Sequence, residues 1–460
     1  MSSFKGKVVL VGLLLTLTFA VPVPAQTIGD ADDGTTLKQI IIFGRHGIRS
    51  SVVGPSDLEK FSQNEYPVFK DAATGKDVPA GYLTPRGREA ARLLGSYFHY
   101  YLLHEGLLTG NAPTDIARSY FRANSIQRSY VTAAQFGAGL IPDATIPVHS
   151  YRIAAPAEPD PVFDPIAAKV ATVDPGRAAA EVQGTFGSGA AIASAYSGEL
   201  SLIRSVLSPT GSVDPTAEQI SLTAYSPVRA AGGSINTGGL ALTNYAADPF
   251  VMQYADNFPL ADVAWGRLLP SPLSQQTRLV TLQINIAMRQ PYVNQVQSSN
   301  AASHVLRSMK QAMSGSRLPG AFGNGKSQVL VIISSDYYVA GLAGLLGLHW
   351  TLPGYQPDFC SPGGALVFEL RQSKRSKEYL VRAFYTSQTF GQLRELTPLT
   401  LEEPPATMQL TIPGGGTSTS DLDVKFAAFE RLLSKALNQK YVQPYWKEVP
   451  PGVLTDVPLD

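Results

Sequence analysis

A short segment carries two arginines and a histidine between glycines, Arg45-His46-Gly47-Ile48-Arg49. Guanidinium groups are permanently charged and forked, which suits them to phosphate or carboxylate. The histidine between them can act as a nucleophile or a base toward an anion that they hold. The segment therefore predicts anion chemistry. The alternative is a solvated basic loop with an incidental histidine.

The segment follows a run of four large apolar residues, Ile40-Ile41-Ile42-Phe43. Such a run is typical of a strand that is buried on both faces, as in a parallel sheet. Ligands of open α/β sheets bind beyond the carboxyl ends of the strands, and residues 45–49 lie at such an end. Gly44 and Gly47 are expected to let the backbone come close to a bound group.

Two other predicted strands also end in polar side chains. The strand over 117–124 leads to Arg128 at the start of a helix, and the strand over 327–333 leads to Asp336 at the start of another. A strand end that meets a helix N-terminus favours anions. These matching positions favour a shared site with His46. An ordinary surface arginine and a helix-capping aspartate are the alternatives.

The chain as a whole predicts an α/β fold with a mixed, mainly parallel central sheet flanked by helices. Thr84 is expected to cap a helix that runs to Leu103, and residues 365–370 and 380–387 are expected to form two antiparallel strands. Between these parts the composition shifts to proline-rich turns and alanine-rich helical pieces. We expect a catalytic core over residues 27–145 and 285–460, with an inserted, mainly α-helical subdomain over 146–284.

The N-terminal residues 1–25 have the pattern of a secretory signal peptide. Lys5 and Lys7 precede an apolar stretch over 8–20, and small residues over 23–25 provide a cleavage site. Cleavage would lower the formal net charge from +1 to −1, because two lysines leave with it. The mature protein is therefore expected to be periplasmic or secreted.

The charge and composition of the chain limit which kinds of binding partner and cofactor we expect. A net charge near zero argues against nucleic acid, since phosphate-backbone binding needs a basic face. No later segment is apolar enough over about 18 residues to span a membrane.

The single cysteine, Cys360, excludes an intramolecular disulfide and fits export in a bacterial envelope. No zinc-binding spacing occurs among the histidines, so no metal or cofactor is expected. The oligomeric state stays open.

Several ordered segments together resemble the histidine acid phosphatases, closest to their periplasmic bacterial acid phosphatase and phytase branch. The segment 45–49 is similar to that family's Arg-His-Gly-x-Arg signature, although Ser51 stands where a proline is usual. The other similar segments are Leu83–Gly87, Gln127–Ser129, Pro159–Pro165, Trp265–Arg267, Leu348–Gly354 and Pro362–Glu369. The resemblance thus covers nearly the whole mature chain, and implies a phosphoglycerate mutase-like core.

The resemblance also implies roles for the residues at the strand ends. Arg45, Arg49 and Arg128 would bind the phosphate oxygens, His46 would form a phosphohistidine, and Asp336 would exchange a proton with the leaving alcohol and the attacking water. A carboxylic acid holds that proton under acidic conditions, so we expect an acid pH optimum. No metal is needed, because the arginines supply the positive charge.

One departure from the family concerns Ser335, because the family has histidine before the aspartate. A serine hydroxyl is a shorter and neutral donor, so we expect Ser335 to bind phosphate less strongly. Taken together, these residues and the resemblance predict a hydrolase of phosphomonoesters that acts on phytate or sugar phosphates. The alternative is a phosphate-ester-binding protein with weak or no turnover. The segment 50–80 carries few bases, so a strongly basic phytate cradle is not evident.

Overall fold

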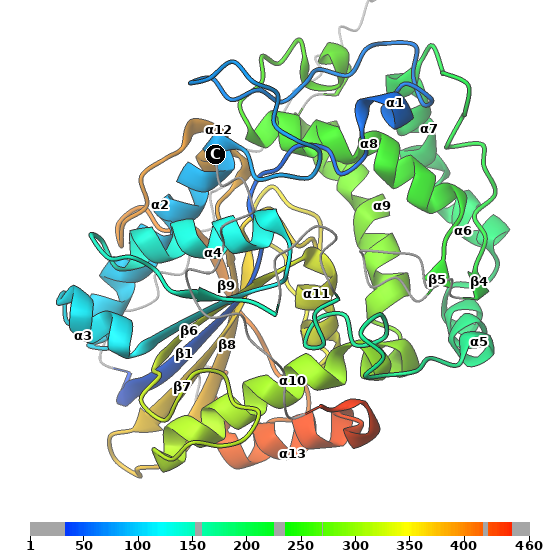
Figure 1. Ribbon diagram of the computed structural model, residues 1–460. Coiled ribbons are helices and arrows are strands. Elements are labelled where there is room, and N and C mark those ends of the chain that lie inside the picture. The colour runs from blue at the N-terminus through cyan, green and yellow to red at the C-terminus, as the bar shows by residue number, and fades with distance from the viewer. Residues whose placement is uncertain (1–32, 152–158, 225–234, 269, 417–421, 444–460) are drawn as a thin grey trace, which may run out of the picture.

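A mixed β-sheet lies at the centre of the fold (Figure 1). The computed structural model describes residues 33–151, 159–224, 235–268, 270–416 and 422–443, so the predicted signal peptide lies outside the described residues. The main sheet has the strand order β10-β8-β7-β1-β6-β2-β3, and β9 pairs with β8. Its strands are β1 (Thr35–Arg45), β2 (Ser119–Ala123), β3 (Val148–His149), β6 (Val329–Ser334), β7 (Ala365–Ser373), β8 (Tyr379–Ser387), β9 (Ala406–Gln409) and β10 (Val424–Lys425).

The core strands β1, β6, β2 and β3 are parallel to one another. The strands β7 and β8 continue the sheet on the other side of β1 in antiparallel pairs, as predicted for residues 365–370 and 380–387. The prediction of a mixed α/β sheet with parallel core strands is therefore confirmed. The carboxyl ends of β1 and β6 lie side by side, because Arg45 is in register with Ser334.

Helices cover both faces of the sheet. Helices α2 (Pro85–His104) and α4 (Gln127–Leu140) pack on one face, against Ile40 and Ile42. Helices α10 (Pro291–Ser314), α11 (Asp336–Leu345) and α13 (Phe426–Ala436) pack on the other, against Ile41 and Phe43. All four of these strand residues are fully buried, which confirms a strand covered on both faces. Thr84 caps α2 as predicted, since its side chain accepts from the Gly87 N–H.

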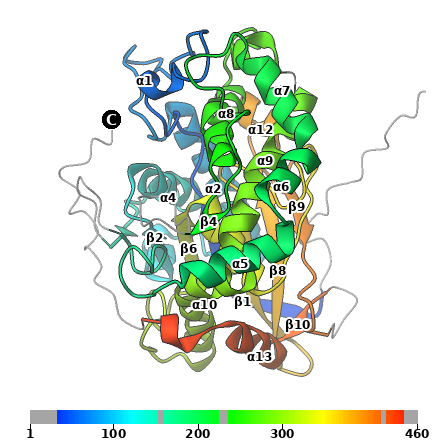
Figure 2. The ribbon, with the colours of Figure 1, turned by 90° about the vertical axis from the view of Figure 1, so that its right-hand side faces the viewer.

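The segment between β3 and β6 is mainly helical, and several of its helices face the viewer in Figure 2. Its elements before α10 are α5 (Pro175–Phe186), α6 (Gly189–Ala195), α7 (Ser197–Leu207), α8 (Gly239–Ala255), the 3-10 helix Val263–Gly266, α9 (Pro270–Met288) and the hairpin strands β4 (Thr223–Ala224) and β5 (Ile235–Asn236). The short elements elsewhere are α1 (Pro55–Leu58), α3 (Ala112–Ala117), α12 (Phe390–Glu395) and the 3-10 helix Gln439–Tyr441. The predicted subdomain boundaries at 146 and 284 stay a prediction.

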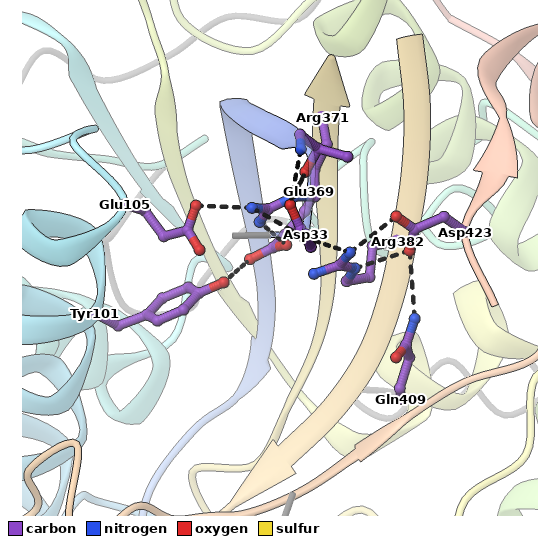
Figure 3. Close-up of polar contacts among 9 residues, drawn as sticks. Asp33, Tyr101, Glu105, Glu369, Arg371, Arg382, Gln409 and Asp423 are labelled. Carbon is purple, nitrogen blue, oxygen red and sulfur yellow. Dashed lines mark hydrogen bonds and ion pairs between the residues drawn. The ribbon is translucent and has the colours of Figure 1, made fainter. Parts of the chain in front are cut away.

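A buried network of charges joins β7 to its neighbours (Figure 3). The Arg371 side chain is 3% exposed and forms ion pairs with Glu369 at 2.7 Å and Glu105 at 2.8 Å. Its Nε–H also donates to the Thr35 hydroxyl at 2.7 Å. The network therefore ties β7 to β1 and to the end of α2. Next to it, Arg382 on β8 pairs with Asp423 and Asp33.

Replacing Arg371 by methionine is expected to lower the free energy of unfolding by about 3–5 kcal/mol, because buried carboxylates lose their partner. Urea unfolding monitored by circular dichroism measures this loss. Arg375→Met is the matched control, since Arg375 is exposed on the turn that follows. Equal unfolding midpoints for the two variants would contradict the prediction.

Candidate active site

The backbone at the end of β1 is fixed by its neighbours on both sides. The His46 N–H donates to the Ser334 carbonyl at 2.9 Å, and the His46 carbonyl accepts from the Gly363 N–H at 2.9 Å. The Arg45 N–H donates to the Gly364 carbonyl at 2.8 Å. The histidine is therefore held between the end of β6 and the loop before β7.

The His46 imidazole is buried and neutral. Its Nδ1 lies 2.9 Å from the Gly47 carbonyl, which can only accept, so Nδ1 carries the proton. Burial, followed by the charges of Arg128, Arg45 and Arg49, holds the pKa of His46 well below its usual range. The other ring nitrogen, Nε2, then keeps a free lone pair even under acidic conditions.

Arg45 joins the end of β1 to the start of α11. Its guanidinium forms an ion pair with Asp336 at 3.0 Å and donates to the Cys360 carbonyl at 2.5 Å. Both side chains of the pair are largely buried, at 4% and 13% exposed. The predicted placement of Asp336 beside the arginines is therefore what the structure shows.

Arg49 forms an ion pair with Asp248, a residue that no sequence pattern indicated as part of the site. Both of its Nη atoms lie 2.7 Å from the carboxylate oxygens of Asp248, which α8 supplies from the helical segment. Burial opposes ionisation of Asp248, but the charge and hydrogen bonds of Arg49, the charge of Arg45 and a backbone hydrogen bond from Val52 together lower the pKa of Asp248. No motif surrounds Asp248, so only the three-dimensional fold reveals it.

Arg128 lies in the first turn of α4, as predicted. Its positive charge is near enough to His46 and Arg49 to influence both. Its Nη1 donates to the Gly81 carbonyl at 3.2 Å. Burial, then the charge of Arg49, lowers the pKa of Arg128 to about 10, so it remains charged at acid and neutral pH. The α4 helix also fixes the histidine loop, because the Gly47 N–H donates to the Thr132 hydroxyl at 3.0 Å.

Ser335 is the N-cap residue of α11, but its side chain does not cap the helix. It is half-buried and directly precedes Asp336. The preceding residue, Ser334, provides the carbonyl that holds the His46 N–H. Ser335 thus lies at the predicted strand end, with its hydroxyl not committed to the helix backbone.

The glycines around the histidine lie close to neighbouring protein atoms, and their predicted role in letting the backbone approach a bound group stays a prediction. A Cβ on Gly44 would lie 2.8 Å from the side chain of Ile333. A Cβ on Gly47 would lie 3.1 Å from the Gly87 carbonyl. A larger residue at either position would have to displace these neighbouring atoms.

The site combines three guanidinium groups with two carboxylates around a neutral imidazole. Among the described residues, the buried Nε–H groups of Arg45, Arg49 and Arg128 have no hydrogen-bond partner. Buried donors without a partner cost free energy, which favours an anion bound between these arginines.

No group of three or more His, Cys, Asp or Glu in the described parts of the chain is arranged to hold a metal ion. Likewise, no described helix is long and apolar enough to cross a membrane.

Asp248 is expected to weaken anion binding, since it places a negative charge against Arg49. Replacing it by asparagine should lower the dissociation constant for inorganic phosphate about tenfold, because one buried repulsive charge is removed. Isothermal titration calorimetry at pH 5 measures this. Asp262→Asn removes the same charge from an exposed position and should leave the constant unchanged. Weaker phosphate binding by Asp248→Asn would show that orienting Arg49 matters more than the charge.

Fold and site together define a class of protein: an α/β protein with a histidine and arginines at the strand ends of its sheet. The model of the histidine phosphatase superfamily (branch 2) matches residues 36–187. Phytase AppA of Escherichia coli strain K12 is 27% identical over 445 residues, covering 92% of this chain and 96% of that protein. Glucose-1-phosphatase of Providencia rettgeri is 25% identical and covers 91% of this chain and 95% of its own length.

A solved structure is also similar to this chain over most of its length. Hafnia alvei phytase in complex with tartrate matches with a TM-score of 0.79 at 26% identity, covering 89% of this chain and 99% of that chain. Over residues 36–187 the chain is thus similar to the histidine phosphatase superfamily (branch 2), and over most of its length it is similar to proteins named phytase and glucose-1-phosphatase.

Proposed function

We propose that this protein hydrolyses phosphomonoesters at acid pH through a phosphohistidine intermediate. The observation that carries the proposal is the His46 ring. Its Nδ1–H is committed to the Gly47 carbonyl, so Nε2 is free to attack, and three arginines surround the ring. A neutral nucleophile beside positive charge suits the attack on a phosphate ester.

The reaction proceeds in two transfers. Nε2 of His46 forms a bond to phosphorus while the bond from phosphorus to the ester oxygen breaks, and Asp336 gives its proton to the leaving alkoxide. Water then attacks the phosphohistidine, Asp336 takes a proton from that water, and inorganic phosphate and neutral His46 are released. Arg45, Arg49 and Arg128 bind the non-bridging oxygens and stabilise the charge of the transition state.

Acid conditions suit both partners of this reaction. In this proposal the leaving alcohol takes its proton from a carboxylic acid, and carboxylic acids in general hold their proton under acidic conditions. His46 must remain unprotonated, and its depressed pKa keeps it so. We therefore expect the rate to be highest at acid pH.

A buried acid behind the site is expected to make the fold more stable in acid. Asp164 accepts from the Tyr338 hydroxyl of α11, and burial raises the pKa of Asp164 to about 6. Between pH 6 and about 4 the folded state holds a proton that the unfolded chain has released, so the free energy of unfolding rises as the pH falls. The gain totals about 3 kcal/mol.

Urea unfolding at pH 4, 5, 6 and 7 measures this gain in the wild-type protein and in Asp164→Asn. The asparagine keeps an acceptor for Tyr338 but cannot titrate. The difference in unfolding free energy between the two proteins should change with pH by about 3 kcal/mol. A constant difference would rule out this role for Asp164.

Phytate and sugar phosphates such as glucose 1-phosphate are the proposed substrates, in line with the names of the similar proteins. The alternative is a phosphate-ester-binding protein with weak or no turnover, because Ser335 replaces the family's histidine. Hydrolysis of p-nitrophenyl phosphate and phytate from pH 3 to 7 separates these functions. Activity with an acid optimum supports the enzyme; ester binding without turnover supports the alternative.

We further propose that the protein is exported to the periplasm or secreted after removal of residues 1–25, and works without a metal or organic cofactor. In this proposal residues 27–145 and 285–460 form the catalytic core and 146–284 form a helical subdomain. The mainly helical character of the segment between β3 and β6 supports this division. Mass spectrometry of the mature N-terminus tests the cleavage site.

A further inference from the structure

A cavity of about 780 Å³ lies at the edge of the sheet where the parallel strands begin, and it is open to solvent. Lys38, near the start of β1, forms part of its wall, whereas Arg45 ends the same strand at the proposed reaction site (Figure 1). At about 3.3 Å per residue, the two positions are about 23 Å apart. The cavity is therefore separate from the reaction site. Its volume lies within the range of about 300–1,000 Å³ that is usual for small-molecule sites.

Every charged side chain in the cavity wall is a cation, and these are Lys38, Arg118 and Lys326. They come from the amino ends of three neighbouring strands, since β6 lies between β1 and β2 in the sheet. Adjacent strands are about 4.8 Å apart, so the backbones of Lys38 and Arg118 are separated by about 10 Å across the sheet. Lys326 precedes the strand between them. The wall therefore presents positive charge over a width of about 10 Å.

The protein does not neutralise these three cations. Within the described ranges, their side chains form no ion pair and no hydrogen bond. The acids that are nearest in sequence have other partners. Glu378, directly before β8, pairs with Lys425 at 2.9 Å, and Asp115 of α3 accepts from the Thr109 hydroxyl at 2.8 Å. Uncompensated like charges repel one another, which favours a bound anion in the cavity.

A β-bulge in β1 places Lys38 at the cavity. Leu37 of β1 is opposite Arg371 of β7. Gln39 is already opposite Leu370, so one residue of β1, Lys38, has no counterpart in β7. Bulges of this kind bend a strand and redirect a side chain, and they are over-represented near functional sites. The bulge thus supports a binding role for this lysine.

Hydrogen bonds between the segments hold the wall in place. The Gln328 N–H donates to the Arg118 carbonyl at 2.7 Å, which joins the segment before β2 to the start of β6. The Gln39 side chain donates to the Ser327 carbonyl at 3.0 Å, which joins the start of β1 to the same segment. The backbones that carry the three cations are therefore fixed relative to one another before a ligand binds, which favours affinity.

We propose that this cavity is a non-catalytic binding site for small molecules that carry several phosphate groups, such as phytate. One phosphate group is too small to pair with cations spread over about 10 Å, whereas several phosphates on one ring extend over such a width. The proposal goes beyond the proposed function and does not depend on it, because no residue of the reaction site lines this cavity.

Calorimetric titration of His46→Ala with phytate tests the proposal without turnover. We expect two phytate molecules per chain, one at the strand ends that carry the arginines and one at the cavity. Combining Lys38→Gln with Arg118→Gln should weaken one of these binding steps by about tenfold or more, since two charge-assisted contacts are lost. Lys435→Gln removes an exposed charge of α13 outside the cavity wall, and this matched control should leave both steps unchanged.

The titration distinguishes failure of this proposal from failure of the proposed function. A single binding step that Lys38→Gln with Arg118→Gln weakens would support the cavity and reject ester binding at the reaction site. Binding that is the same with and without these two substitutions would overturn the cavity proposal. An equal loss in Lys435→Gln would also overturn it, because diffuse attraction between net charges would then explain the binding.

Two further measurements make the test independent of the double variant. Lys326→Gln changes an exposed side chain in the loop before β6, so the fold should tolerate it, and phytate binding at the cavity should weaken several-fold. Inorganic phosphate in about tenfold excess should not displace phytate from the cavity, because it lacks the additional phosphate groups. Unchanged phytate binding in Lys326→Gln, or displacement by inorganic phosphate, would contradict a site for several phosphate groups.

Discussion

Replacing His46 by alanine is expected to lower kcat for p-nitrophenyl phosphate by about 10⁴-fold or more. Loss of a nucleophile removes the covalent route, and the remaining arginines can bind the ester but cannot accept the phosphoryl group. Binding should survive, because Arg45, Arg49 and Arg128 keep their partners. The expected result is therefore a large loss in kcat with a modest change in substrate affinity.

Trapping of the phosphoenzyme makes this prediction specific to the mechanism. Quenching of the wild-type enzyme in alkaline detergent during turnover of a labelled ester should yield phosphohistidine, at most one per chain, that is stable in base and labile in acid. His104→Ala is the control, since His104 is exposed at the end of α2. Label on the His46→Ala protein, or turnover near the wild-type rate, would show that another group accepts the phosphoryl.

The parts of the fold that could be predicted from the sequence are those with strong local signals. The apolar runs over Ile40–Phe43 and 329–333 are short and rich in β-branched residues, which favours buried strands, and both form buried strands. Thr84 and Pro85 mark the start of α2 because N-capping depends on neighbouring residues alone. Arg128 and Asp336 could be predicted as site residues because each follows a predicted strand, β2 or β6, and lies at the start of a helix.

The features that could not be predicted depend on contacts between distant segments. Asp248 reaches Arg49 only because α8 folds over the end of β1, and the pair is 199 residues apart in sequence. The need for Gly44 likewise arises from Ile333, on another strand. The same applies to a cavity whose wall combines Ser50 and Ser51, in the loop after β1, with Pro249 of α8. The loop and α8 lie near each other in both ribbon views (Figures 1 and 2).

Replacing Ser335 by histidine is expected to raise kcat by about 10²–10³-fold, provided that the phosphate group lies beside this strand end. An imidazolium would add a charge-assisted donor to the developing phosphoryl charge, and such donors typically contribute that factor. The substitution removes no helix cap, because the Ser335 side chain does not accept from the backbone of α11. Its backbone is extended, so a longer side chain is compatible with the local conformation.

The pH dependence of this gain separates a catalytic effect from a general change in the pocket. The gain should be largest below about pH 6.5, where a histidine is protonated, and should decline above it. Ser335→Ala serves as the reference and should lose less than about tenfold, since a neutral hydroxyl is a weak donor. A pH-independent gain would indicate a steric effect. No gain in Ser335→His, with a large loss in Ser335→Ala, would instead mean that serine itself is the donor for which this pocket is built.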